Sequence, residues 1–188
     1  MPSSTAESTG ISLSLTYYMR NFYKSNPTTY KASIRKDYTD SELSYEDARA
    51  LKRAARQLMS YDISDEDTGE DFYESIQAFV ETYNNTMESS GSSSDRDIAR
   101  SHKNLEKLTQ KYSEELKEIG LNIQDDGSLK ITESILKGAT GKELKKVFSK
   151  ESGLMSQSQS LARKLNQNSY DVLYTQLTGN GGRLNIVL

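Results

Sequence analysis

The segment that decides the fold is DRDIARSHKNLEKLTQKYSEELKEIG, residues 95–120. Its apolar residues recur every seven positions, with two more near the intermediate positions: Ile98, Leu105, Tyr112 and Ile119, then Leu108 and Leu116. This is the a and d pattern that forms the seam of a coiled coil or helical bundle. We therefore predict one helix over residues 95–119, and Gly120 is well placed as the glycine that ends it.

A helix with an aromatic face is predicted just before this seam, over residues 69–88. Thr68 can cap its start, and large apolar side chains then follow at helical spacing: Phe72, Ile76, Phe79, Tyr83 and Met87. The run SSGSSS at residues 89–94 predicts a flexible break. Because this connection is short, the two helices should pack antiparallel.

Two further helices complete the predicted bundle. Ser44 and Asp47 resemble a capping box, with Asp where Glu or Gln is usual. Apolar residues then follow at 3-4-3 spacing, which predicts a helix over residues 44–60: Ala48, Leu51, Ala55 and Leu58. A last helix is predicted over residues 154–177, and a glycine-rich run at 179–182 ends it.

A short β-hairpin is predicted over residues 121–131. Two alternating segments flank Asp126-Gly127, which is the strongest short-range hairpin signal in a sequence. An isolated hairpin of this size is marginally stable, so its apolar face should pack against helix residues such as Leu116 and Ile119. Two short helices follow, at residues 132–138 and 141–150.

The two ends of the chain are less clearly patterned. Residues 1–10 are rich in Ser and Thr and are predicted to be disordered. Over residues 11–24 a period-2 alternation typical of a strand competes with a helical face, and we favour a helix from about Leu15 to Tyr23. At the other end, residues 184–188 alternate and could form an edge strand.

These elements predict a mainly α fold, a helical bundle or coiled-coil hairpin with one short β-hairpin. Residues 11–178 form a single helical domain, and 179–188 are a flexible glycine linker and a short tail. Hydrophobic residues are only 34% of the chain, against about 45–50% in ordinary globular proteins. The core should therefore be thin, and an elongated shape fits better than a sphere.

Composition also excludes several classes of function. The net charge is −3 and no basic stripe is visible, which argues against nucleic acid as the partner. Without cysteine there can be no disulfide, no thiolate catalysis and no Cys-based zinc site. No apolar run approaches the roughly 20 residues that cross a bilayer, and the N-terminus lacks the pattern of a cleavable signal. The chain should be cytoplasmic or exported by a signal-independent route.

Three motifs could carry chemistry, and each has a simpler interpretation. His102 is the only histidine, and without cysteine it cannot complete a usual zinc site. The acidic residues between Asp62 and Asp71 lack the spacing of a calcium loop and suit a solvated helix start. The glycines at 179–182 follow a helix, whereas a phosphate-binding loop follows a strand. We therefore predict no catalytic residue, no metal and no cofactor.

Tyrosine is conspicuous, with 12 tyrosines against 4 phenylalanines and no tryptophan. Six of them cluster in the first quarter: Tyr17, Tyr18, Tyr23, Tyr30, Tyr38 and Tyr45. Tyrosine suits half-buried positions with one wet edge, as at interfaces. A thin core capped by amphipathic rings explains the pattern equally well.

The second half of the chain resembles the flagellar filament-cap family, the hook-associated proteins at the tip of a growing flagellum. The resemblance is carried by FVETYNN at 79–85, LKEIGLNI at 116–123 and QDDGSLKI at 124–131. In that family a "YN" on one helix precedes a second helix ending in "L-x-x-I-G-I", followed by "D-G-x-L". Leu136 and residues 146–148 look like the family's next segments. The resemblance covers about residues 72–165.

The departures from the family pattern shape the expectation. The family's head domain and its N-terminal leucine-methionine segment have no counterpart here, and the chain stops at Leu188 where a long C-terminal coiled-coil helix normally follows. The resemblance therefore implies a shortened relative that keeps only the stalk-like helical unit.

The predicted function is that of a non-enzymatic structural or assembly protein acting through helix–helix contacts. The alternative is a cytoplasmic helical adaptor or chaperone-like module. The partner is expected to be a protein, either a different one or a second copy of this chain. The predicted interface is the heptad seam with the neighbouring aromatic stripe: Ile98, Leu105, Leu108, Tyr112, Leu116, Ile119, Phe72, Ile76, Phe79 and Tyr83.

Overall fold

The computed structural model describes residues 13–64 and 69–179, which form a mainly helical fold with one small antiparallel sheet, as the sequence predicts. In chain order its elements are α1 Leu13–Phe22, α2 Ala32–Arg35, α3 Asp40–Leu58, α4 Glu70–Gly91, α5 Arg96–Lys111, α6 Ser113–Glu118, β1 Leu121–Ile123, β2 Leu129–Ile131, α7 Glu133–Gly138, α8 Gly141–Phe148 and α9 Gly153–Thr178.

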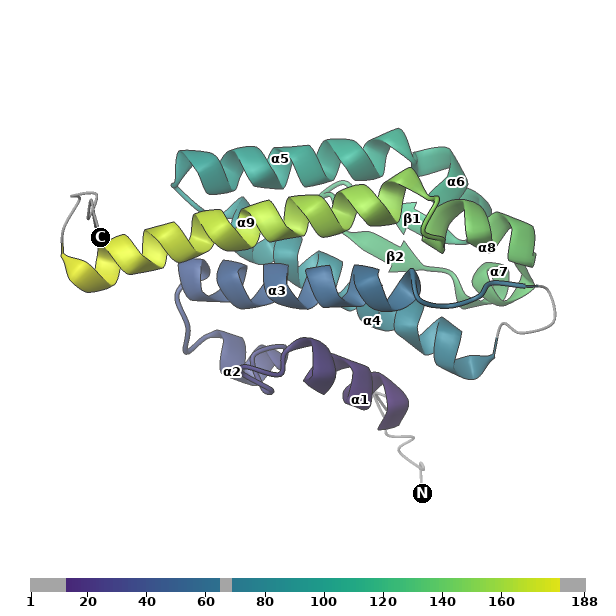
Figure 1. The fold of residues 1–188 in the computed structure, drawn as a ribbon, viewed down its shortest axis with the longest axis horizontal. Coiled ribbons are helices and arrows are strands. Elements are labelled where there is room, and N and C mark those ends of the chain that lie inside the picture. The colour runs from purple at the N-terminus through teal and green to yellow at the C-terminus, as the bar shows by residue number, and fades with distance from the viewer. Residues whose placement is uncertain (1–12, 65–68, 180–188) are drawn as a thin grey trace, which may run out of the picture.

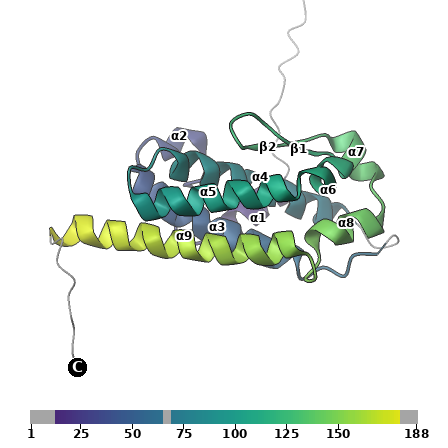
Figure 2. The same cartoon turned by 90° about the horizontal axis from the view of Figure 1, so that it is seen from above.

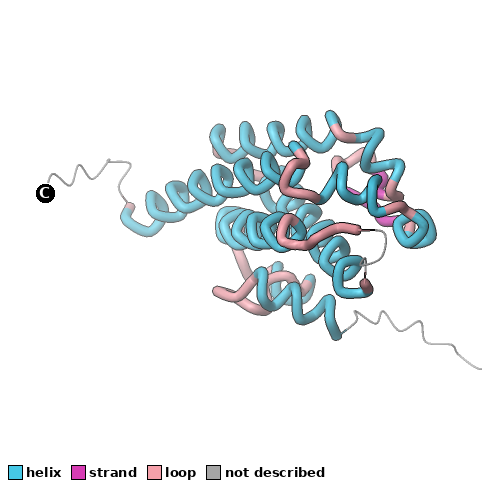
Figure 3. The backbone as a smooth tube through the Cα atoms, turned by 45° about the vertical axis from the view of Figure 1, so that its right-hand side comes forward, coloured by secondary structure: helices cyan, strands magenta, loops and turns pink. Residues whose placement is uncertain are grey.

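The long helices run side by side, with α3 at the centre of the bundle (Figure 1). α3 packs most extensively against α9 and α4, while α5 lies on α9 and α1 lies on α4. Seen from above, the hairpin occupies one end of the molecule, on the side of α5 that faces away from α9 (Figure 2). The two strands are confined to this end, and the last turns of α9 project beyond the bundle at the other (Figure 3).

The N-terminal segment is a helix, so the strand alternative for residues 11–24 is wrong over the part that the structure describes. α1 begins at Leu13, two residues before the predicted start. Its buried face carries Met19 and Phe22, and Tyr23 follows in the core. The disorder predicted for residues 1–10, the cap at Thr68 and the strand at 184–188 lie outside the described residues.

The predicted start of the central helix is wrong by four residues. The capping box is formed by Thr39 and Glu42, because the Thr39 hydroxyl accepts from the Glu42 N–H at 3.3 Å while the Glu42 carboxylate accepts from the Thr39 N–H at 2.8 Å. This pair has the usual Glu at the third helical position. Ser44 and Asp47 instead lie buried within α3.

The helix predicted over residues 95–119 is interrupted once. α5 ends at Lys111 and α6 begins at Ser113, and Tyr112 between them has φ −104° and ψ 20°, outside helical geometry. The Tyr112 ring lies against Gly153 at the start of α9, where a Cβ atom would collide with the Tyr112 hydroxyl oxygen. The heptad pattern of the sequence thus continues across a break in the helix at Tyr112.

The flexible break predicted at residues 89–94 is shorter than expected. α4 continues to Gly91, and the Ser90 hydroxyl is bonded to the Thr86 carbonyl at 2.5 Å. Only residues 92–95 connect the helices, and the Asp95 carboxylate caps α5 by accepting from two backbone N–H groups. Serine inside a helix can satisfy its hydroxyl on the preceding turn, which is why a serine run need not be a loop.

One main hydrophobic core fills the bundle, and a smaller cluster of Ala48, Ile98 and Leu165 joins α3, α5 and α9. The predicted antiparallel packing of the aromatic helix on the seam helix is only a minor contact, since α5 rests mainly on α9. On the aromatic face of α4, the Phe72 ring packs against Tyr61 and Phe148, and Tyr83 donates to the Gly127 carbonyl in the hairpin turn. Within the described ranges, the search for a helix able to span a bilayer finds none.

The hairpin pairs Leu121 with Ile131, Asn122 with Lys130 and Ile123 with Leu129. Its turn is closed by the Gly127 N–H on the Gln124 carbonyl and by the Gln124 N–H on the Ser128 carbonyl, and Gly127 has φ +79°. Leu121 and Leu129 are buried with Leu116 and Ile119 in the main core, as predicted. Gly120, with φ +81°, joins α6 to β1.

Candidate functional site

The ten residues of the predicted interface lie mostly in the interior of this chain. Nine are buried, and Tyr112 is half-buried. Most of the seam joins the main core, while Ile98 packs between α3 and α9. Burying one such aliphatic side chain contributes roughly 1.5–3 kcal/mol, so this seam serves the stability of the fold. A partner could use it only by displacing the chain's own helices.

Ser90 and His102 come together in space, the two residue types of a serine nucleophile and its general base. The Ser90 hydroxyl oxygen lies 3.0 Å from His102 Nδ1. However, Ser90 is fully buried, and its single proton points to the Thr86 carbonyl at 2.5 Å. In the bond between Ser90 and His102, the imidazole N–H must therefore be the donor and the Ser90 oxygen the acceptor. A general base would instead accept the serine proton. The pair holds the end of α4 to α5.

A buried polar network holds the N-terminal segment to the bundle. Arg35 donates to both carboxylate oxygens of Asp47, at 3.0 and 3.1 Å, and to Glu88 at 2.9 Å. Tyr23 donates to Asp47 at 2.7 Å and accepts from Asn85 at 3.1 Å. Burial raises the pKa of the Asp47 carboxyl, and the bonds from Arg35 oppose this. Tyr23 and Asp47 at its centre are closed to solvent, whereas the Glu88 side chain at its edge is exposed.

Three cationic side chains from two helices line one groove, although the sequence itself shows no basic stripe. Lys52 and Arg56 of α3 and Arg163 of α9 line about 300 Å³ of open space. Burial, followed by the surrounding arginines, lowers the pKa of Lys52. The i, i+4 spacing of Lys52 and Arg56 was visible in the sequence, but Arg163 is brought to them only by the packing of α3 on α9.

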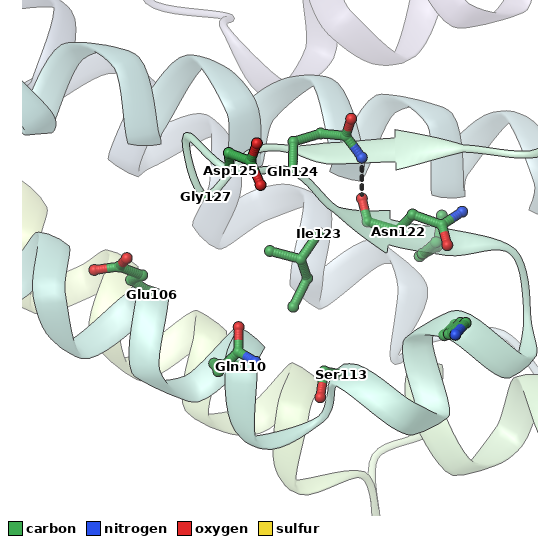
Figure 4. A pocket seen from close by; sticks show the side chains of 10 residues that line it. Glu106, Gln110, Ser113, Asn122, Ile123, Gln124, Asp125 and Gly127 are labelled. Atoms are coloured by element: carbon green, nitrogen blue, oxygen red, sulfur yellow. Dashed lines mark hydrogen bonds between the residues drawn. The ribbon is translucent and has the colours of Figure 1, made fainter.

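A groove of about 520 Å³ lies between β1 and helices α5 and α6 (Figure 4). One wall consists of four polar side chains: Glu106, Gln110, Ser113 and Lys117. The other wall is β1 itself with its turn, residues 121–125 and Gly127. We call this the β1 groove. Ile123 points into it, facing the α5 wall (Figure 4).

The outward backbone groups on the two edges of the hairpin differ in their hydrogen bonding. On β2, the side-chain amide of Asn84 from α4 donates to the Leu129 carbonyl at 2.9 Å and accepts from the Leu129 N–H at 2.8 Å. Asn84 thus satisfies both outward groups of Leu129, as a neighbouring strand would. Tyr83 supports this contact by donating to the Gly127 carbonyl at 3.1 Å, and burial raises its pKa to about 12.

A second candidate site is the projecting end of α9. Tyr170, Leu173, Tyr174 and Leu177 stand at i, i+3, i+4 and i+7, which places them on one helix face. Tyr170 is 48% exposed, Tyr174 41% and Leu177 86%. We call this the α9 stripe. The sequence pattern of the stripe was available, but its exposure was not, because that depends on where α3 and α5 end.

Some tyrosines belong to the core and others lie on the surface, so both interpretations of their abundance apply to part of the set. Tyr23 and Tyr83 are core residues whose hydroxyls are hydrogen-bonded. Tyr170 and Tyr174 are exposed, with their rings stacked at 6.2 Å between centroids. Over the residues described, no group of three His, Cys, Asp or Glu side chains suited to a metal ion is present. Part of the acidic run, residues 65–67, lies outside those ranges.

Comparisons with protein-family models, with curated proteins and with solved structures find no match for this chain.

Proposed function

We propose that this chain is a non-enzymatic assembly protein that associates with a second copy of itself through helix–helix contacts made by the α9 stripe. The observation that carries the proposal is the exposed apolar face at the free end of α9. A helix end that meets only water usually carries charged residues, yet from Leu165 to Thr178 the only charged side chain is Asp171. Depletion of charge together with exposed tyrosine is typical of protein interfaces.

The α9 stripe is also self-complementary. In an antiparallel pair of α9 helices centred between Leu173 and Tyr174, each tyrosine meets a leucine of the other copy, Tyr170 on Leu177 and Tyr174 on Leu173. A two-fold interface requires this kind of match, because the same patch must fit itself. Asp171 then faces Gln176 and not a second carboxylate, so no like charges oppose each other.

The proposal keeps the sequence-based function and moves its contact surface. The heptad seam is occupied within the chain, whereas the α9 stripe is open. The resemblance of residues 72–165 to the filament-cap family supports an assembly role of the stalk-like kind, and the stripe lies just beyond that segment. The pairing area is small, so we expect weak, concentration-dependent association.

Light scattering coupled to size exclusion tests the proposal. The wild-type chain should shift from monomer toward dimer across a hundredfold concentration series, and Leu177→Asp should shift less over the same series. Because Leu177 is 86% exposed, this substitution leaves the core intact. Tyr17→Asp, at a position 62% exposed on α1, is the matched control and should dimerise normally. Monomer mass for the wild-type chain throughout would refute the proposal and favour the adaptor alternative.

A further inference from the structure

The β1 groove runs along the open edge of a strand. All three residues of β1 line it, Leu121, Asn122 and Ile123, and no residue of β2 does. Successive side chains of a strand point to opposite faces, so a cavity lined by consecutive residues lies beside the edge and not over a face. The groove is also within the size range of ligand-binding clefts.

The backbone groups that face the groove follow from the hairpin register. The Thr132 N–H bonds the Gly120 carbonyl and the Gln124 N–H bonds the Ser128 carbonyl, so Asn122 belongs to the hydrogen-bonded pair between them. In an antiparallel ladder the residues at alternate positions then point N–H and C=O outward. On β1 these are Leu121 and Ile123.

These outward groups lack the protection that Asn84 gives to Leu129 on the other edge. Asn84 takes both outward groups of Leu129 on β2. For Leu121 and Ile123, no hydrogen bond to the outward backbone groups is formed within the described part of the chain. Leu121 is buried, whereas Ile123 is only partly so, which makes Ile123 the point of access. An open edge of this kind is the template to which an extended peptide adds.

Charge at the two ends of the β1 groove selects the chemistry and direction of that peptide. Glu106 lies at the turn end, since a Cβ on Gly127 would be 3.9 Å from its Cγ, and Asp125 belongs to the turn itself. Lys117 lies at the other end, where β1 begins. A strand entering antiparallel to β1 should therefore carry a basic residue at its N-terminal end.

We propose that residues 183–186 of a second copy, Arg-Leu-Asn-Ile, pair with β1 as a third, antiparallel strand. The match follows the register: Leu184 opposite Ile123, Asn185 opposite Asn122, and Ile186 opposite Leu121. Apolar residues then meet apolar residues and asparagine meets asparagine, pairs that stabilise a sheet. Arg183 reaches Asp125 and Glu106, and it lies far from Lys117.

The contact must be made between two copies. Gly153 touches Tyr112, the residue next to the Ser113 end of the groove wall, so this end lies beside the start of α9. Gly179 follows 26 helical residues later, about 39 Å away at 1.5 Å per residue. Residues 180–186 span at most about 25 Å when extended, so they cannot return to their own groove. This head-to-tail contact does not involve the α9 stripe.

Hydrogen exchange and anisotropy on the intact chain test this contact directly. The probe is a fluorescein-labelled synthetic peptide, Asn-Gly-Gly-Arg-Leu-Asn-Ile-Val-Leu, the sequence of residues 180–188. Binding should slow exchange of the Ile123 amide and leave the Asn122 amide, already inside the hairpin, unchanged. A peptide of scrambled order should not bind. Binding without a change at Ile123, or no binding at millimolar peptide, would overturn the proposal.

A charge exchange identifies the partner of the peptide's arginine. Glu106→Lys should weaken binding by about tenfold or more, the loss expected for one hydrogen bond between charged groups. The peptide with glutamate in place of arginine should recover binding to this variant and lose it to the wild-type chain. Glu114→Lys makes the same charge change at an exposed position outside the groove and should bind normally. Equal losses in the two variants would mean that net charge and not the groove governs binding.

Discussion

Gly120→Ala should destabilise the fold through the junction between α6 and β1. Gly120 has φ +81°, a conformation that costs an alanine about 1–2 kcal/mol. A Cβ atom there would also lie 2.8 Å from the Thr132 carbonyl oxygen and 2.9 Å from Ile135 Cβ. That carbonyl accepts the N–H groups of Ile135 and Leu136 at the start of α7, so it cannot move freely. Overpacking adds about 1–3 kcal/mol, and we expect a total loss of about 2–5 kcal/mol.

Urea unfolding followed by circular dichroism measures this loss. For a chain of this size the expected change moves the urea midpoint down by about 1–2 M. Gly138→Ala is the matched control, because a Cβ at that helical glycine meets nothing within 4 Å and its φ is not positive. The control should be neutral or more stable by up to about 1 kcal/mol. If Gly120→Ala costs less than about 0.5 kcal/mol, the junction is not constrained as the reasoning requires.

Three further outcomes are expected. Arg35→Met should lower the free energy of unfolding in urea by about 3–5 kcal/mol, because it leaves the fully buried Asp47 carboxylate without its ion pair. Adding Asp47→Leu should recover part of this loss. A double variant less stable than either single variant would contradict this account. Leu129→Ala should cost about 2–5 kcal/mol if the hairpin packs on the core as described, and a loss below about half a kcal/mol would count against that packing. Burial lowers the pKa of His102, so the folded state disfavours the imidazolium: this contribution is present above the ordinary pKa of 6.5 and is lost as pH falls below it. The drop in unfolding free energy between pH 7.5 and 5.5 should therefore shrink in His102→Gln, and an unchanged drop would exclude His102 as its source.

The helices and the hairpin could be predicted because their signals are local. Apolar spacing within a single segment identified α4, α5 and α9, and Asp126-Gly127 located the turn of the hairpin. The break at Tyr112 has no such local signal, and the contact found beside it joins the Tyr112 ring to Gly153, a residue 41 positions later in the chain. Local pattern cannot report a contact between distant segments.

The candidate sites depend on such distant contacts even more strongly. The heptad seam predicted an interface, but a seam pattern is the same whether its partner is another chain or another helix of the same chain. The α9 stripe was not recognised because its exposure depends on the lengths of α3 and α5. Asn84 looks like an ordinary helix residue, and only the position of β2 gives it the role of an edge partner.

The capped edge of β2 also sets a limit on growth. A bare two-stranded ribbon invites further strands on both sides, and such stacking is how exposed edges begin amyloid-like aggregates. Here the Asn84 amide takes the outward groups of Leu129 on one side, and the other side opens onto a groove whose far wall is α5. Any strand that joins β1 finds a helix behind it, so addition ends after a single event. Each hairpin therefore takes up one strand, which limits the growth of the sheet but not the length of a head-to-tail assembly.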